Sequence, residues 1–153
     1  MGSPMAPTPF GQSCRHPRGG PVITWAGRLI VLFGAAHTIL ALTLMRAASH
    51  AGDWFSGALW RDDLADMSPA NSALWLSLNS FGIPLVLVGL TVLWLDRRGI
   101  TPPRFLAWVL GLWTAQCAVI LILTPWPIMA VAVGLLVAGS RRAAPTPQPT
   151  TAV

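Results

Sequence analysis

The sequence contains no lysine and no glutamate, and charged residues make up only 10% of its 153 residues. Soluble domains carry about a quarter charged residues, so this composition excludes an ordinary soluble domain. The formal net charge of +5 arises from ten arginines and five aspartates. A basic balance can indicate a nucleic-acid partner. These arginines flank apolar segments instead, so we expect no nucleic acid as a partner.

Cysteine is also scarce, with Cys14 in a polar N-terminal stretch and Cys117 in the middle of an apolar segment. Two thiols so placed predict neither a disulfide nor a metal or redox motif. The sequence has no glycine-rich phosphate loop, nucleophile elbow or zinc-ligand pair. We therefore expect no cofactor, and no motif names a reaction.

The chain consists mainly of four apolar segments: Trp25–Met45, Ala73–Leu95, Phe105–Leu123 and Trp126–Gly139. A transmembrane helix needs about 20 apolar residues to cross a hydrocarbon core of about 30 Å, and the first three segments reach that length. The fourth would give only about 21 Å of helix. We expect it to span with local thinning of the bilayer; a re-entrant hairpin with the third segment is the alternative.

The predicted fold class is therefore all-α, an integral membrane four-helix bundle with spans at about 25–45, 73–95, 105–124 and 126–140. Arginines are in excess around the start of the first span, between the second and third, and after the fourth, at positions 15, 18, 28, 97, 98, 104, 141 and 142. Cytoplasmic loops carry such an excess. Both termini are expected in the cytoplasm, in a multi-pass protein of the cytoplasmic membrane.

Domain boundaries follow from composition. Residues 1–22 and 141–153 are rich in proline and polar residues and are predicted to be disordered tails, which leaves 23–140 as the transmembrane domain. In the long outer loop, Trp54, Trp60 and neighbouring apolar residues recur at near-helical spacing. A short amphipathic helix on the outer leaflet and an irregular loop over the bundle mouth are both open, and either would cover the outer end.

Polar residues inside a bilayer are costly and often functional. His37, Asn79, Ser80 and Gln116 are each predicted to lie about 10–12 Å below the outer surface, counted at 1.5 Å per residue. Gly27, Gly34 and His37 share one face of the first helix, whereas Asn79 and Gly82 share one face of the second. Small residues permit close helix contact in membranes, so we expect these faces to meet. Pro84 is predicted to kink the second helix.

His37 has two interpretations. It could act as a general acid/base or contact a lipophilic ligand in an outward-facing pocket, since imidazole exchanges protons near neutral pH. Alternatively, a neutral imidazole could join two helices by bonding Asn79 or Ser80, a contact worth about 0.6–2 kcal/mol. The second interpretation is favoured because the predicted spans contain no carboxylate near it.

Asp62, Asp63 and Asp66 have the DDxxD spacing with which prenyltransferases and class I terpene synthases bind magnesium diphosphate. Three carboxylates within one helical turn could hold a hard cation. The motif occurs once, lies on the predicted outer side and has only Arg61 as a basic neighbour. A solvated acidic run before a helix is the preferred interpretation.

The run from Trp25 through Gly34 and His37, followed by Ala73 through Phe81, Pro84 and Gly89, resembles an uncharacterised family of small four-helix bacterial membrane proteins. That family is a domain of unknown function, loosely similar in layout to the small DoxX-like bundles. The resemblance covers about 25–139. It implies a four-helix topology and no known activity, and it implies a role for His37.

We expect a non-enzymatic accessory, binding or resistance-type membrane protein that holds a lipid or apolar metabolite near His37, Asn79, Ser80, Gln116, Trp54 and Trp60. The alternative is a membrane-embedded isomerase or cyclase acting on an isoprenoid or polyketide-like substrate, with His37 as acid/base. The expected partners are the lipid bilayer and a lipophilic small molecule. A homo-oligomer or a membrane partner protein stays open.

Overall fold

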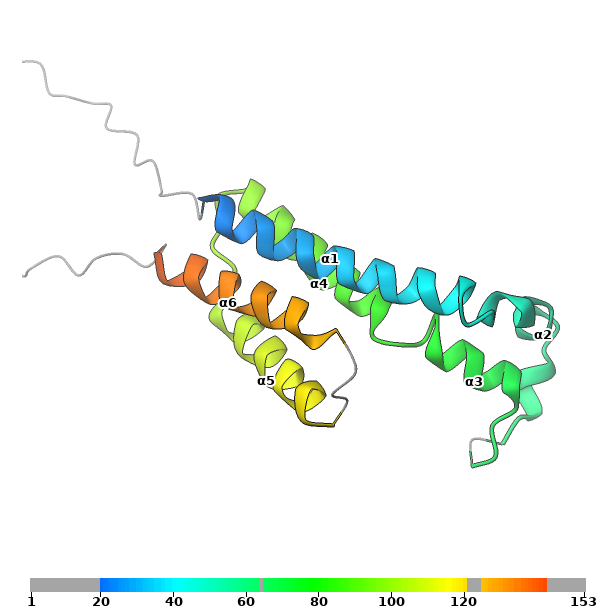
Figure 1. Ribbon diagram of the computed structural model, residues 1–153. Coiled ribbons are helices and arrows are strands. Elements are labelled where there is room, and N and C mark those ends of the chain that lie inside the picture. Colours follow the sequence, from blue (N-terminus) through cyan, green and yellow to red (C-terminus); the bar gives the residue numbers. More distant parts are fainter. Residues whose placement is uncertain (1–19, 64, 121–124, 143–153) are drawn as a thin grey trace, which may run out of the picture.

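The structure is a computed structural model that describes residues 20–63, 65–120 and 125–142. All regular elements of the described residues are helices and none is a strand, which confirms the all-α prediction (Figure 1). Its elements are α1 (Gly20–Thr43), η1 (Ala47–His50), α2 (Ala51–Phe55), η2 (Ala58–Arg61), α3 (Pro69–Leu76), α4 (Gly82–Arg97), α5 (Arg104–Ile120) and α6 (Trp126–Arg142).

Helices α1 and α4 lie antiparallel and touch through glycines. A Cβ atom built on Gly34 would lie 2.5 Å from the carbonyl oxygen of Gly82, and one built on Gly89 would lie 2.9 Å from the carbonyl oxygen of Gly27. Real Cβ atoms essentially never come closer than 3.0 Å, so only glycine permits this approach. The prediction that these small faces meet is confirmed, and close backbone approach of this kind is typical of helices that pack within membranes.

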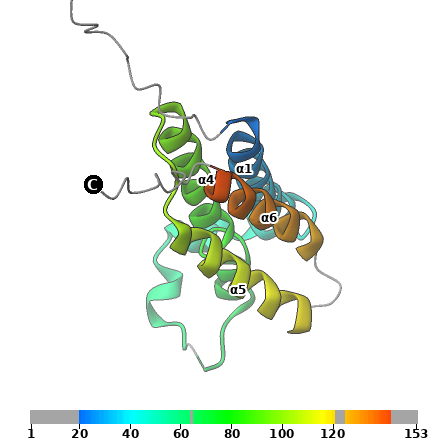
Figure 2. The same cartoon turned by 90° about the vertical axis from the view of Figure 1, so that its left-hand side faces the viewer.

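Helix α6 lies between α1 and α5, as the turned view shows (Figure 2). The buried core is made of small and medium-sized apolar side chains from all four long helices, among them Ile23, Ile30, Val92 and Leu136. Gly139 on α6 allows Ile23 of α1 to approach closely. Helix α4 joins this core mainly by packing on α1, and α5 joins it mainly by packing on α6.

The second apolar segment is not one helix. Helix α3 ends at Leu76, residues 77–81 form a turn, and α4 starts at Gly82. Pro84 is the third residue of α4, in the first turn, where backbone N–H groups have no partner within the helix. The expectation of a continuous span at 73–95 with a kink at Pro84 was therefore wrong: Pro84 follows a complete break.

Other boundaries also differ from expectation. Helix α1 starts at Gly20 and α6 runs through Arg142, so both take in a few residues that we assigned to the tails. With 17 residues, α6 is about 25 Å long, closer to a full span than the sequence indicates. The predicted disorder of residues 1–19 and 143–153, and the last part of the third span at 121–124, lie outside the described residues.

The outer loop forms short helices rather than one amphipathic helix. Elements η1, α2 and α3 pack on one another, and η1 also packs on the end of α1 (Figure 1). This cluster lies at the far end of α1, away from the first turn of α5 and the last turn of α6. Neither expected form describes this segment, because it consists of several short helices and Trp60 is exposed instead of packed over the bundle.

The described ends of α1 and α6, together with the α4–α5 connection, lie at one end of the molecule (Figure 1). We call this the arginine end; its arginines are Arg28, Arg97, Arg98, Arg104, Arg141 and Arg142. Gly99, with a φ of +71°, terminates α4 there, and the amide of Ile100 donates to the carbonyl of Leu95 at 2.9 Å as in a Schellman C-cap.

In the described ranges, one helix has the length and apolar composition needed to cross a membrane, namely α1 with 24 residues. Helix α5 is apolar but shorter. Large apolar side chains nevertheless point outward on every long helix, including Leu32, Ile39, Leu87, Trp94, Trp108, Leu112, Val119 and Val131. The four-span membrane bundle stays a prediction, developed below.

Candidate functional site

His37 lies on α1 beside the break in the second segment. Its Nε2 is 3.3 Å from the carbonyl oxygen of Leu76, the last residue of α3. A carbonyl oxygen only accepts hydrogen bonds, so this contact requires a proton on Nε2 and leaves the lone pair of Nδ1 free in a neutral ring. In an unbroken helix the amide of Ser80 would bond this carbonyl. His37 takes its place.

The imidazole also packs on an aromatic cluster. The ring centroids of His37 and Phe81 are 4.1 Å apart, and Phe81 contacts Phe33 of α1 at 6.2 Å and Trp113 of α5 at 5.2 Å. The two separations from Phe81 to Phe33 and Trp113 lie in the range of favourable aromatic pairs, and His37 lies closer still. The turn that interrupts the second segment thus places Phe81 between α1 and α5.

Beside this cluster is a small apolar cavity of about 40 Å³. Its lining comes from α1, the turn, α5 and α6, namely Phe33, Phe81, Trp113, Thr114, Cys117, Trp126 and Met129. The hydroxyl of Thr114 donates to the carbonyl of Leu110 at 2.7 Å, which satisfies it within its own helix. The cavity, called the aromatic pocket below, therefore offers mostly apolar contacts.

The predicted polar layer is only partly assembled. Ser80 lies in the turn, where its hydroxyl donates to the carbonyl of Ser77 at 3.2 Å and its Oγ is 3.4 Å from the amide of Gly82. Asn79 and Gln116 are exposed. Neither Asn79 nor Ser80 bonds His37, so the predicted partners of the imidazole were wrong. The break rotates the turn residues away from the face they would occupy in a continuous helix.

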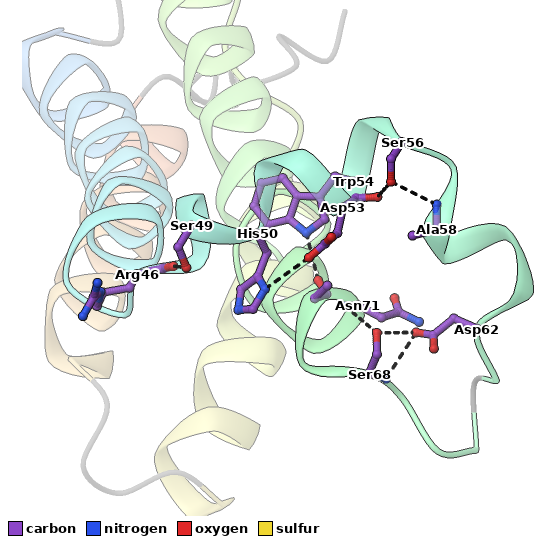
Figure 3. A network of polar contacts seen from close by, with 11 residues as sticks. Arg46, Ser49, His50, Asp53, Trp54, Ser56, Ala58, Asp62, Ser68 and Asn71 are labelled. Atoms are coloured by element: carbon purple, nitrogen blue, oxygen red, sulfur yellow. Dashed lines mark hydrogen bonds and ion pairs between the residues drawn. The ribbon is translucent and has the colours of Figure 1, made fainter.

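The two loop tryptophans have different positions. The Nε1 of Trp54 donates to the carbonyl of Ala70 at 2.8 Å, which joins α2 to α3 (Figure 3). Trp60 is 91% exposed. Neither residue lines the aromatic pocket, so the expectation that they contribute to the ligand pocket is not met.

The three aspartates do not form a metal site in the described part of the chain, where no group of three potential ligands gathers. Asp62 and Asp63 each use one carboxylate oxygen to accept hydrogen bonds from nearby residues. Asp62 accepts from the hydroxyl and amide of Ser68 at 2.8 and 3.2 Å (Figure 3), and Asp63 accepts from the amide of Ala65 at 2.9 Å. Asp62, Asp63 and Asp66 lie in an irregular segment rather than in one helical turn, which removes the geometric basis of the magnesium prediction.

The hydrogen bond from the Ser68 hydroxyl, assisted by Asn71, lowers the pKa of Asp62 below its ordinary value of 3.8. Hydrogen bonds to the charged form of a carboxyl group favour ionisation. Ser68 in turn caps α3, because its Oγ accepts from the amide of Asn71 at 3.2 Å. The acidic motif therefore has a structural role at the start of α3.

None of the residues that line the aromatic pocket was predicted from the sequence, although two signals point to it. Trp113 is the one tryptophan in the middle of an apolar segment, where the preference of this side chain for the membrane interface does not explain it. In addition, Phe33 and His37 are one helical turn apart, as are Trp113 and Cys117. Neighbours at this spacing share a helix face.

The helical domain also matches a known family over residues 22–143, described as a family of unknown function, DUF6463. The chain belongs to this family. The DUF6463 match covers every described helix, from just inside α1 to just beyond α6, and brings no activity with it. No curated protein and no solved structure matches the chain. The DoxX-like layout and the bacterial origin implied by the resemblance stay predictions.

Proposed function

We propose that this DUF6463 protein crosses the cytoplasmic membrane four times, with both termini inside, and binds the apolar end of a lipophilic small molecule in the aromatic pocket. The four crossings are α1, the broken pair α3–α4, α5 and α6. Binding, rather than catalysis, is the proposed role.

The outward-facing side chains support the membrane placement. On α5, Trp108, Leu112 and Val119 recur at helical spacing and are 73%, 76% and 82% exposed. Soluble monomers rarely expose large contiguous apolar patches. Inside, the contacts are made by glycine, alanine and medium-sized residues. Large apolar residues outside and small residues between helices suit a lipid solvent.

Helix lengths are compatible with this placement. Helices α5 and α6 each have 17 described residues, the lower limit of about 17–25 residues for a transmembrane helix. Arginines at the arginine end can extend their charged groups to the headgroups while their stems remain among the acyl chains. The same end would face the cytoplasm, because arginine excess marks cytoplasmic loops.

The aromatic pocket carries the functional proposal. It joins residues from α1, the turn, α5 and α6, so it depends on the whole bundle and on the break in the second segment. A cavity needs about 10–15 Å³ of free space to hold one water molecule, so about 40 Å³ admits a few groups of that size. A methyl branch or a short chain end fits there, which favours a branched or linear lipophilic ligand whose remainder lies along the bundle surface.

The geometry favours binding over acid/base chemistry. Nε2 of His37 is engaged by Leu76, and no described carboxylate bonds this imidazole. Asn79 and Gln116, the groups that would orient a substrate, face outward. The enzyme alternative is supported by one observation, the free Nδ1 of a ring that packs on the pocket residue Phe81.

Cys117 provides a direct test of ligand binding. Cys14→Ser leaves Cys117 as the single thiol, and its alkylation by N-ethylmaleimide can be timed in detergent with and without farnesol or palmitate. We expect one of these ligands to slow alkylation at least threefold. The matched control carries Cys14→Ser, Cys117→Ser and Ala115→Cys, since Ala115 is exposed on the same helix; its rate should not change.

Equal rates with and without either ligand at Cys117, or equal protection at position 115, would contradict binding in the pocket. Reporter fusions after Gly57 and after Thr150 test the topology separately, because the proposal requires opposite sides of the membrane. For the enzyme alternative, His37→Gln would abolish turnover of an isoprenoid substrate while leaving the protection of Cys117 intact.

A further inference from the structure

A second, larger cavity lies at the arginine end, between the first turn of α5 and the last turn of α6. Its volume is about 180 Å³, and it is lined by Arg104, Ala107, Trp108, Val137, Ser140 and Arg141. The aromatic pocket shares no lining residue with this arginine cavity, because its lining begins five residues beyond Trp108 on α5, at Trp113, and ends eight residues before Val137 on α6, at Met129. Nothing in the proposed function uses it.

Two positive charges line this cavity without a counter-charge. Within residues 20–63, 65–120 and 125–142, neither Arg104 nor Arg141 forms an ion pair or stacks on an aromatic ring. Other arginines at this end do have such partners, since Arg28 lies 5.3 Å from the ring centroid of Trp25 and Arg98 lies 4.9 Å from that of Trp94.

The one aspartate at the arginine end is also engaged. The hydroxyl of Thr24 on α1 donates to Asp96 at 2.5 Å, and Asp96 is absent from the cavity wall. Arg104 and Arg141 are both exposed and line the same cavity, so their like charges repel each other, and a bound anion would relieve that repulsion. Planar guanidinium groups match phosphate oxygens especially well.

The rest of the wall is apolar or satisfied. Ala107 and Val137 supply apolar surface, and the hydroxyl of Ser140 donates to the carbonyl of Leu136 at 2.8 Å. Trp108 is also part of the exposed apolar surface of α5, together with Val109 and Leu112. The arginine cavity thus presents two cationic groups at the rim of a surface suited to acyl chains.

We infer that the arginine cavity binds the phosphate group of an anionic phospholipid, with the acyl chains along the exposed face of α5. This inference rests on the membrane placement proposed above but not on the aromatic pocket. Basic pockets between helices on the cytoplasmic side are a known way to bind anionic headgroups. A free phosphate would use the two arginines but would gain nothing from the adjoining apolar face.

Native mass spectrometry of the full chain, released from detergent, tests the inference. The ligands are dioleoyl phosphatidylglycerol, dioleoyl phosphatidylcholine and inorganic phosphate. We expect one molecule of phosphatidylglycerol to remain bound, at an affinity at least tenfold above that for phosphatidylcholine. The double variant Arg104→Gln with Arg141→Gln should weaken phosphatidylglycerol binding about tenfold, because each arginine near a membrane surface contributes to anionic lipid attraction.

The matched control is Arg97→Gln with Arg142→Gln, which removes the same charge from the same end without touching the cavity wall. It should change the affinity less than twofold. If both double variants lose the same affinity for phosphatidylglycerol, the inference is overturned, because general charge attraction would then explain the binding. Competition by inorganic phosphate at the same concentration as the lipid would also overturn it, in favour of a free anion.

The aromatic pocket provides an internal reference. Farnesol or palmitate should protect Cys117 equally in both double variants, since neither changes that lining. Preserved protection with lost phosphatidylglycerol binding assigns the effect to the arginine cavity. Absent protection with retained lipid binding contradicts the aromatic-pocket proposal and leaves the lipid site standing.

Discussion

A single methyl group at Gly34 should separate α1 from α4. The Cβ of Gly34→Ala would meet the carbonyl oxygen of Gly82 at 2.5 Å and the Cβ of Leu85 and amide of Val86 at 3.0 Å. Two of these three atoms are backbone, which no rotamer change can move. Ordinary contact begins at 3.4 Å, so α4 must withdraw by about 0.9 Å at its first turn if packing at this density is to be kept.

Overpacking of this kind costs about 1–3 kcal/mol, and we expect Gly34→Ala to lower the free energy of unfolding by that amount. Gly134→Ala on α6 is the matched control, because a Cβ there meets nothing within 4 Å. Alanine is the better helix former by about 1 kcal/mol, so this variant should be neutral or more stable. The two proteins carry the same added methyl group within a helix.

The measurement is unfolding in dodecylmaltoside micelles with increasing sodium dodecyl sulfate, followed by far-ultraviolet circular dichroism. The midpoint for Gly34→Ala should fall below that of the unmodified chain, and the midpoint for Gly134→Ala should not. If both variants unfold at the unmodified midpoint, α1 and α4 do not approach each other through glycine. If both fall together, the effect belongs to helix substitution in general rather than to this interface.

Three further predictions concern individual hydrogen bonds. Folding lowers the pKa of Asp62, so the ionised carboxylate contributes fully to stability above about pH 3.8, and this contribution is lost as the pH falls through the pKa of the folded state. Ser68→Ala removes the largest cause of the shift and should raise the pKa of Asp62 in the folded protein. The carboxyl carbon chemical shift in NMR measures that pKa. Trp54→Phe removes the Nε1 donor to Ala70 and should speed proteolysis of the outer loop, consistent with a loss of about 1 kcal/mol, whereas Trp60→Phe at an exposed position should leave the cleavage rate unchanged. His37→Leu should cost about 1 kcal/mol in the same detergent unfolding assay because it leaves the Leu76 carbonyl without a donor, whereas His37→Gln, which retains an N–H donor, should lose less; equal losses would argue against the hydrogen bond.

The helix contacts set by local periodicity could be predicted from the sequence. Gly27 and Gly34 are seven residues apart, as are Gly82 and Gly89, so each pair returns to one face after two turns. Two helix faces whose glycines have the same spacing can pack together in only a few registers. In the structure the two helices run antiparallel, so that Gly34 lies opposite Gly82 and Gly27 lies opposite Gly89.

The break at residues 77–81 could not be predicted in the same way. Ser77, Asn79 and Ser80 interrupt the apolar pattern at this point, but polar residues inside a membrane segment can equally belong to a site on a continuous helix. Pro84 is compatible both with a kink inside a helix and with the first turn of a new one. The choice depends on groups distant in sequence. His37, 39 residues earlier, bonds the carbonyl that the break exposes, and an aromatic cluster holds Phe81.

This break also explains why equal depth in the membrane did not predict a shared site. The expected layer of His37, Asn79, Ser80 and Gln116 rested on continuous helices, and a count of residues along a helix gives the height of a side chain but not its direction. The turn carries Asn79 outward, and the packing of α5 on α6 leaves Gln116 exposed. Phe81, two residues after Asn79, and Trp113, three residues before Gln116, meet instead, with ring centroids 5.2 Å apart. Helix rotation, which follows from apolar packing across the whole bundle, therefore decides which groups form the pocket, and in this chain it brings together aromatic rings rather than amides.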